Sequence, residues 1–167
     1  MSDLENTEAR PYLTFKLGDE LFALNVAKVR EVLDFCTITK IPRTPEFMSG
    51  VINLRGNVVP VVDLRQCLEM SRTEQTLNTC IIVVEVQLEG EPTVIGALAD
   101  SVDEVIILEP AQIQPPPRMG LHIRTDYIQG MGKRDNEFII ILDIDKVFSF
   151  EDANVLHAET KILEEVA

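Results

Sequence analysis

The chain has little of what nucleic-acid-binding, secreted and metal-dependent proteins require. Its 167 residues include no tryptophan, two histidines and three cysteines, and 15 lysines and arginines stand against 28 aspartates and glutamates. The net charge of -13 argues against binding to nucleic acids or to anionic membranes, because both require a cationic surface. The longest apolar runs, at 80–84 and 138–142, fall far short of the roughly 20 residues that a membrane helix needs. We therefore expect no nucleic-acid partner and no direct membrane insertion.

The cysteines and histidines form no familiar catalytic or metal-binding pattern. Cys36, Cys67 and Cys80 are widely spaced and lie among apolar residues, which is typical of buried thiols in a reducing cytoplasm. The sequence also lacks a glycine-rich phosphate loop, a serine nucleophile elbow and a histidine-rich metal motif. We expect a cytoplasmic protein that is not an enzyme, with no catalytic residues, no metal and no cofactor.

Short apolar segments separated by turn residues fill most of the chain. Alternating apolar residues flank Gly18-Asp19 and predict a β-hairpin there. A second hairpin is predicted across Arg55-Gly56, with Pro60 favouring an edge strand or a bulge. Residues 26–34 fit either a strand or a short helical turn. The pattern as a whole predicts a mainly β protein.

The two halves of the sequence resemble each other. Residues 46–68 align with residues 126–148, and residues 22–33 align with residues 95–106. The matching pairs include Gly50 and Gly130, Asp63 and Asp143, Phe47 and Tyr127, Leu68 and Phe148, Val29 and Val102, Glu31 and Glu104, and Val32 and Val105. A repeat of roughly 65 residues has little core of its own. We therefore predict two small β-barrels that share an interface or exchange a strand.

This organisation gives three regions. Residues 1–11 have no apolar period and are expected to be a flexible tail. Residues 12–150 are expected to hold the double barrel, with approximate halves 12–75 and 76–150 and strand exchange between them as one option. Residues 151–167 have apolar residues near helical spacing and predict an amphipathic C-terminal helix.

Arg55 stands out as a candidate recognition residue. It lies on a predicted turn between two apolar strands of an acidic protein. A guanidinium held on a rigid turn suits recognition of an acidic or carbonyl-bearing partner, although a solvated turn arginine is the simpler alternative. Glu31 is the expected partner of Arg55, because the repeat keeps Glu104 together with Lys133 and Arg134 at the corresponding turn.

Two segments carry a resemblance to a known family. TPEFMSGVINLRGNVVPVVDLR and TDYIQGMGKRDNEFIIILDIDKVF are similar to sequences of the CheW family of bacterial chemotaxis coupling proteins. The likeness covers residues 12–150. It implies two intertwined, five-stranded, SH3-like barrels with short helices. It also implies a non-catalytic adaptor of two-component signalling, which binds the cytoplasmic tip of a chemoreceptor and the regulatory domain of the histidine kinase CheA. Such a protein is cytoplasmic and is recruited to membrane receptor arrays by its partners.

The resemblance also implies which residues contact the receptor. Asn53, Leu54, Arg55 and Gly56 match the family's receptor-contacting motif. Val29 and Glu31 match positions tied to the same surface, and Cys80 and Gly96 match positions associated with receptor coupling. Core packing and turn geometry are the alternative reading for Val29, Cys80 and Gly96. No short motif marks the kinase-binding surface, so its residues stay unassigned.

Two other function classes remain open from the residues alone. The first is a β-barrel that binds a small ligand, which an apolar cavity inside a barrel would favour. The second is a metal-dependent acidic enzyme that uses Asp143 and Asp145. A role for Asp63 and Asp143 in capping turns through backbone N–H groups is the simpler expectation.

Overall fold

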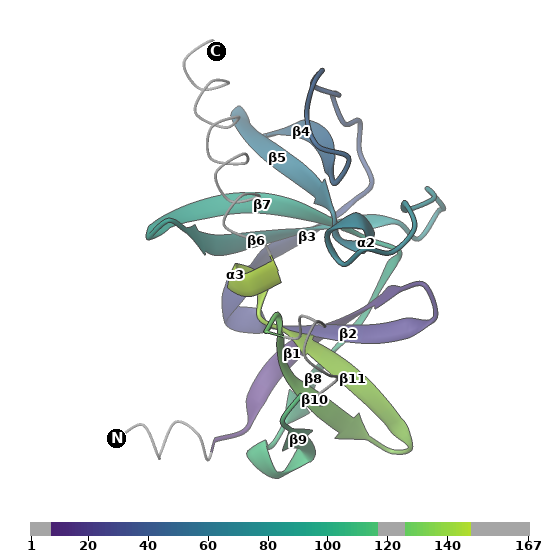
Figure 1. Cartoon of the computed structure of the whole chain (residues 1–167), viewed down its shortest axis with the longest axis vertical. Coiled ribbons are helices and arrows are strands. Elements are labelled where there is room, and N and C mark those ends of the chain that lie inside the picture. The colour runs from purple at the N-terminus through teal and green to yellow at the C-terminus, as the bar shows by residue number, and fades with distance from the viewer. Residues whose placement is uncertain (1–7, 117–125, 148–167) are drawn as a thin grey trace.

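Two β-sheets with short helical segments between them make up the structure, a computed structural model that describes residues 8–116 and 126–147 (Figure 1). In chain order the elements are β1 (Arg10–Leu17), β2 (Glu20–Asn25), η1 (Val26–Lys28), β3 (Val29–Asp34), β4 (Met48–Leu54), β5 (Asn57–Asp63), α2 (Leu64–Cys67), β6 (Cys80–Leu88), β7 (Glu91–Ala99), β8 (Ser101–Leu108), η2 (Pro110–Gln112), β9 (Ile113–Gln114), β10 (Ile128–Arg134), β11 (Glu137–Leu142) and α3 (Ile144–Val147). No helix among the described residues is long and apolar enough to cross a membrane.

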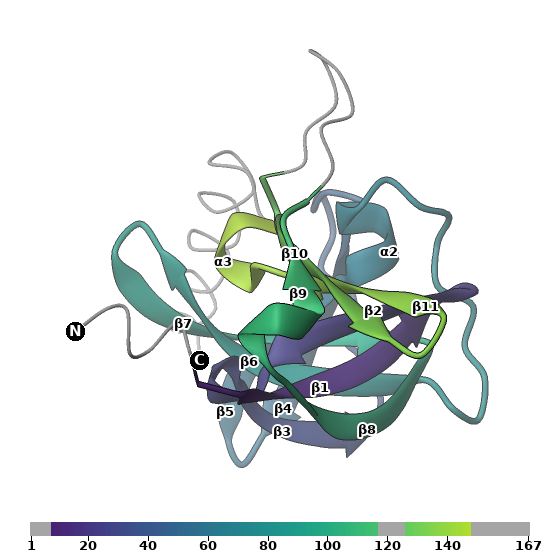
Figure 2. The same ribbon diagram turned by 90° about the horizontal axis from the view of Figure 1, so that it is seen from below.

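Each sheet takes its central hairpin from the other half of the sequence. Barrel 1 has the strand order β3-β6-β7-β5-β4, and barrel 2 has the order β8-β1-β2-β11-β10-β9. The hairpin β1–β2 therefore lies among the strands of the second repeat, and β6–β7 lies among those of the first (Figures 1 and 2). The exchanged hairpins join their hosts through parallel pairs, β7 with β5 and β2 with β11. The predicted intertwined barrels are confirmed, although the two-residue strand β9 gives barrel 2 six strands instead of five.

The sequence repeat falls on matching structural elements. β4, β5 and α2 correspond to β10, β11 and α3 at the aligned positions. The repeated glycines are explained by a close approach of the chain. A Cβ atom at Gly50 would lie 2.2 Å from the Thr39 carbonyl oxygen, and one at Gly130 would lie 2.6 Å from Cγ2 of Ile113. A side chain at Gly50 would push away the segment that bridges to β4 through Thr39, and one at Gly130 would push away β9.

Several local expectations need correction. Residues 26–34 are neither all strand nor all helix, since a 3-10 turn leads into β3. β5 is an inner strand without a bulge at Pro60, which pairs with Val51. Proline is tolerated because the parallel pairing with β7 begins one residue later, at Val61. β1 begins at Arg10, inside the expected tail, because Arg10 pairs with Leu108 of β8. Residues 1–7 and the predicted helix 151–167 lie outside the described residues.

The largest hydrophobic core belongs to both barrels. Leu13, Phe15 and Leu24 from the first hairpin pack in one cluster with Ile82 and Val84 of the second. The Phe15 and Phe22 rings stack in it, with centroids 5.9 Å apart. Smaller clusters fill each barrel separately, one around Val61 and Ile81 in barrel 1 and one around Tyr12 and Ile139 in barrel 2. Because the shared cluster is the largest, we expect the barrels to fold as one unit.

Truncation of Phe15, which is fully buried, should therefore destabilise the whole molecule. Phe15→Ala is expected to lower the free energy of unfolding by about 3–5 kcal/mol, in a single cooperative transition followed by urea denaturation. Leu77→Ala is the matched control, since Leu77 is fully exposed and should change stability by no more than about 0.5 kcal/mol. Two separate unfolding steps would contradict the shared core.

Candidate interaction site

Arg55 lies at the tip of the β4–β5 hairpin, on a turn that holds its backbone in an unusual conformation. The φ angles of Arg55 and Gly56 are 52° and 85°, as in the tight two-residue turns that suit the twist of a hairpin. A positive φ is uncommon for an arginine and costs some stability. The Oδ1 atom of Asn53 accepts a hydrogen bond of 2.7 Å from the Gly56 N–H and braces the turn. Asn53, Arg55 and Gly56 are exposed and Leu54 is half-buried.

Glu31 holds the head of the Arg55 side chain. Nη1 and Nη2 of Arg55 each donate a hydrogen bond of 2.9 Å to one carboxylate oxygen of Glu31. The expected contact between these two residues is therefore confirmed. The Arg55 side chain is nevertheless 70% exposed, against 28% for Glu31. Since a guanidinium carries five N–H donors, several of them remain accessible to a partner.

The pKa values of both groups reflect this pairing. The hydrogen bond from Arg55, helped by its charge, lowers the pKa of the Glu31 carboxyl below its usual value, against a smaller opposing effect of burial. The same hydrogen bond and charge raise the pKa of Arg55. Both groups are therefore charged at neutral pH. Because both are open to solvent, the pair orients the guanidinium more than it stabilises the fold.

The pair also closes barrel 1. Glu31 belongs to β3 and Arg55 follows β4, and these strands are the two edges of the sheet. The segment after β3 continues the closure, because Thr39 and Val51 exchange two backbone hydrogen bonds of 2.9 Å. Barrel 2 has a matching pair, in which Nη1 of Arg134 lies 2.6 Å from the Glu104 carboxylate. The position that matches Arg55 in that turn holds Asp135, also at positive φ, so an arginine at the hairpin tip is particular to barrel 1.

The other predicted site residues lie inside the fold. Cys80 is buried in the shared core, and burial raises the pKa of its thiol. Val29 is half-buried against the same core. Gly96 is buried beside Val61, and a Cβ atom there would lie 2.8 Å from Cγ2 of Ile81. Val83 of β6 pairs with both Glu31 and Gly96, so these two residues lie on either side of one strand, whereas Cys80 pairs with Asp34 at the far end of β3.

Three exposed apolar residues of β3 and β8 were missed by the sequence reasoning. Val32 of β3 is 42% exposed, and Val105 and Ile107 of β8 are 56% and 68% exposed. Val32 pairs with Ile82, and Val105 pairs with Leu13. Directly paired residues point to the same face of a sheet, so these side chains extend the face of the shared core to the surface. Strand parity could have pointed to Val32, had residues 26–34 been recognised as a turn followed by a strand.

The sequence singled out Asp63 and Asp143 as turn caps and Asp143 with Asp145 as a candidate metal site. Asp63 accepts a hydrogen bond from the Arg65 N–H at the start of α2 and two more from Thr73, which confirms its predicted capping role. Asp143 directly precedes α3, where its carbonyl oxygen accepts hydrogen bonds from the Lys146 and Val147 N–H groups, and a capping role of its side chain stays a prediction. Asp145 pairs with Nζ of Lys28 at 2.8 Å. Within residues 8–116 and 126–147, no group of three or more histidine, cysteine or acidic residues is placed to hold a metal.

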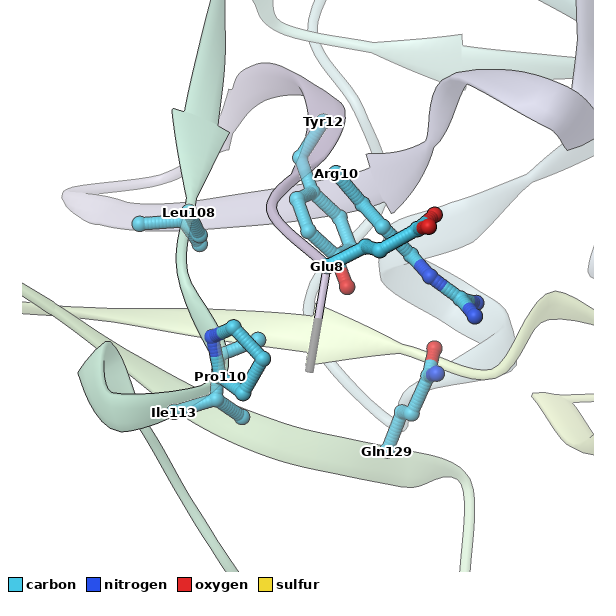
Figure 3. A pocket seen from close by; sticks show the side chains of 7 residues that line it. All are labelled: Glu8, Arg10, Tyr12, Leu108, Pro110, Ile113 and Gln129. Atoms are coloured by element: carbon cyan, nitrogen blue, oxygen red, sulfur yellow. The ribbon is translucent and has the colours of Figure 1, made fainter. Parts of the chain in front are cut away.

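A pocket of about 220 Å³ lies at one end of barrel 2 (Figure 3). Glu8, Arg10 and Gln129 bring polar groups to one side of it, and Leu108, Pro110 and Ile113 line the other. Tyr12 also reaches it, and burial raises the pKa of the Tyr12 phenol while Arg10 opposes the shift. This pocket is small and of mixed polarity. It is not the apolar cavity inside a barrel that a small-ligand-binding protein would need.

Comparison with known proteins agrees with this geometry. The family model of the CheW-like domain matches residues 11–152. A chemotaxis protein CheW from Klebsiella aerogenes is 34% identical over 146 residues, which cover 87% of this chain and 86% of the relative. A chemotaxis protein CheW from Thermotoga maritima is 31% identical over 138 residues, or 81% of this chain and 85% of the relative. The crystal structure of the scaffolding protein TtCheW from Thermoanaerobacter tengcongensis superposes with a TM-score of 0.74 at 36% identity, covering 85% of this chain and 94% of that one.

The intertwined barrels and the likeness to TtCheW define the class first, as a double-barrel scaffolding protein. The chain belongs to the CheW family. It is a scaffold of chemotaxis signalling and not an enzyme.

The Glu31–Arg55 pair gives a direct pH prediction. A carboxyl whose pKa is lowered by folding contributes stability above its unfolded pKa and loses it as the pH falls through the lowered value. An NMR pH titration should place the Glu31 pKa below that of an ordinary glutamate, and Arg55→Gln should raise it back. Arg134→Gln, at the matching pair of barrel 2, should leave the Glu31 pKa unchanged. Equal Glu31 pKa values in wild type and Arg55→Gln would contradict the bidentate contact.

Gly96 generates a second prediction. Gly96→Ala places a methyl group against Ile81 and Val61 in a filled barrel, and overpacking of this kind costs about 1–3 kcal/mol. Urea denaturation measures the loss. Ala23→Gly is the informative comparison, because Ala23 occupies the matching position in β2 and pairs with Ile141 as Gly96 pairs with Val61. An unchanged stability for Gly96→Ala would show that barrel 1 has room there.

Proposed function

We propose that this scaffold couples chemoreceptors to the histidine kinase CheA, and that the surface around Arg55 contacts the cytoplasmic tip of the receptor. The observation that carries the proposal is the clamp on Arg55, which leaves the guanidinium exposed while fixing both ends of the side chain. Most of the entropy loss of ordering an arginine is then incurred before the partner arrives. Such preorganisation increases affinity without adding contacts.

The hairpin tip supplies the polar part of the proposed receptor site. The free N–H groups of Arg55 suit a carboxylate or carbonyl oxygen on the receptor. Asn53 and Gly56 are exposed beside it and bring backbone within reach of the partner. Leu54 is half-buried against the interior of barrel 1 and anchors the turn. These four residues form a small, rigid, charged surface on an otherwise acidic protein.

The apolar part of the proposed site comes from β3 and β8. Val32, Val105 and Ile107 extend the face of the shared core to the surface. Arginine and apolar groups that become buried on binding are the residues that contribute most of the affinity at binding sites, and the proposed surface offers both. An amphipathic helical segment of the receptor is the partner that this combination suits.

Val29, Cys80 and Gly96 are proposed to act through the strands and not by contact. Val29 and Glu31 lie on the same strand, and Val83 sits between Glu31 and Gly96. A larger residue at Gly96 would displace β7 from Ile81 and so alter the position of β6, against which β3 pairs. We infer that substitutions at these buried positions change receptor coupling by moving the Glu31–Arg55 pair.

The kinase contact would use a different part of the molecule, so that receptor and kinase bind at the same time. We propose that the regulatory domain of CheA is this second partner, and we assign it no residues. Simultaneous binding holds the two partners at a fixed distance and raises their effective concentration. A conformational change in the receptor then shifts the populations of the kinase states, because the receptor contacts those states differently. The scaffold itself carries out no chemistry in this mechanism. Such a protein would be cytoplasmic and reach the membrane through its partners.

Capture by a receptor cytoplasmic fragment tests the proposed function. Wild-type protein should be retained by the immobilised fragment, and Arg55→Glu should reduce retention at least tenfold, which corresponds to the roughly 1.4 kcal/mol of one lost charged contact. Arg134→Glu is the matched control, because it removes the corresponding pair of barrel 2 and should leave retention unchanged. Urea denaturation should show both variants to be folded.

Two outcomes distinguish an error in the proposed site from an error in the proposed function. Unchanged capture of Arg55→Glu would reject the site while leaving the function. No capture of wild type by the receptor fragment or by the CheA regulatory domain would reject the function itself.

A further inference from the structure

The two barrels are fastened to each other at two joints, of which the first is built around Asp100. Asp100 lies between β7 and β8, where the chain crosses from barrel 1 to barrel 2. Its carboxylate accepts hydrogen bonds from Nε and Nη2 of Arg65 in α2, at 3.0 and 2.5 Å. It also accepts a bond of 2.6 Å from the Gly18 N–H in the turn of the exchanged β1–β2 hairpin. Both charged side chains are about four-fifths buried.

The second joint also connects a helix, a crossover and an exchanged hairpin, but with the acidic residue on the helix. Lys28 ends η1, where the chain crosses from barrel 2 to barrel 1, and its Nζ donates a bond of 2.8 Å to Asp145 of α3. The other oxygen of Asp145 accepts a bond of 2.9 Å from the Gln87 N–H, near the end of the exchanged β6–β7 hairpin. The two views of the molecule place α2 and α3 on different sides (Figures 1 and 2), so the joints are separate.

The charges of the two joints are reversed. Arg65 and Asp145 occupy aligned positions of the sequence repeat, and Lys28 aligns with Ser101, next to Asp100. The first joint therefore has its cation on the helix and its anion on the crossover, whereas the second has its anion on the helix and its cation on the crossover. Each joint joins a helix of one repeat to a crossover of the other, and each is attractive.

We propose that this reversed polarity is a specificity device, which makes the two repeats of the chain pair with each other and not with copies of themselves. In a pairing of two first repeats from different molecules, Arg65 would meet Lys28. In a pairing of two second repeats, Asp145 would meet Asp100. Both like pairings bring equal charges together in a partly buried site, which is strongly unfavourable. Only the unlike pairing found in the structure satisfies all four charges.

The competing product is a realistic one for this fold. The repeats share their strand order and exchange a hairpin in the native structure, so the same hairpin can enter a barrel of a second chain. Exchange of an identical element between chains is a low-cost route to dimers, and it is a characteristic failure of proteins with repeats. Backbone pairing between strands is available to like and unlike repeats, whereas opposite charge patterns distinguish the two.

Charge reversal at the second joint tests the proposal on the intact chain. The double variant Lys28→Asp with Asp145→Lys keeps that joint attractive, but both helices then carry a cation and both crossovers carry an anion. The charges of the joints then no longer disfavour like pairings. After refolding from urea at high protein concentration, the dimer fraction measured by light scattering on a sizing column should rise several-fold over wild type.

A neutral variant and a matched control complete the experiment. Lys28→Gln with Asp145→Asn removes the charge discrimination at the second joint without reversing it, and the introduced amide keeps an acceptor for the Gln87 N–H. This variant should give an intermediate dimer fraction, and it tests the proposal even if the reversed variant fails to refold. Glu104→Arg with Arg134→Glu reverses an ion pair that lies within a single repeat, and should leave the dimer fraction at the wild-type value. Equal dimer fractions in wild type and the joint variants, or an equal rise in the control, would overturn the proposal.

Discussion

The exchange of hairpins between the two halves of the chain is the constraint on which the rest of the structure depends. Because β6 and β7 sit between β3 and β5, neither repeat can complete a barrel without strands from the other. The largest core then forms between the barrels and contains residues of both hairpins. The exchange also leaves β3 and β4 as the two edges of the sheet, which other contacts must close. The Glu31–Arg55 pair and the Thr39–Val51 pairing meet that need.

The candidate site is a consequence of this closure. Arg55 closes barrel 1 from a hairpin tip, and there its guanidinium faces solvent. The same hydrogen bonds that complete the fold thus present a rigid cation on a protein of net charge -13. Barrel 2 closes with Arg134 and Glu104 but carries Asp135 at the tip. Each repeat thus closes its barrel with a Glu–Arg pair, but only barrel 1 presents an arginine at its hairpin tip. We propose that the receptor is recognised at this tip.

Much of this could be predicted from the sequence, for identifiable reasons. The repeat, the hairpin turns and the Glu31–Arg55 contact followed from turn residues and from aligned pairs such as Glu31 and Glu104. The strand exchange could be raised only as one option, because strand order depends on pairing across the whole chain and not on local pattern. The role of Gly96 was also hidden, since the neighbour that excludes a side chain comes from β6. The exposed apolar residues of β3 and β8 required knowledge of which strand face meets the shared core.

The central claim is that Glu31 prepares Arg55 for the receptor, and a double-mutant cycle on receptor binding tests it most directly. Affinities for a receptor cytoplasmic fragment would be measured by calorimetry for wild type, Glu31→Gln, Arg55→Gln and the double variant. If the clamp orients Arg55, Glu31→Gln weakens binding although Arg55 is still present, and the double variant binds no more weakly than Arg55→Gln alone. Unaltered binding by Glu31→Gln, or fully additive losses, would contradict the account.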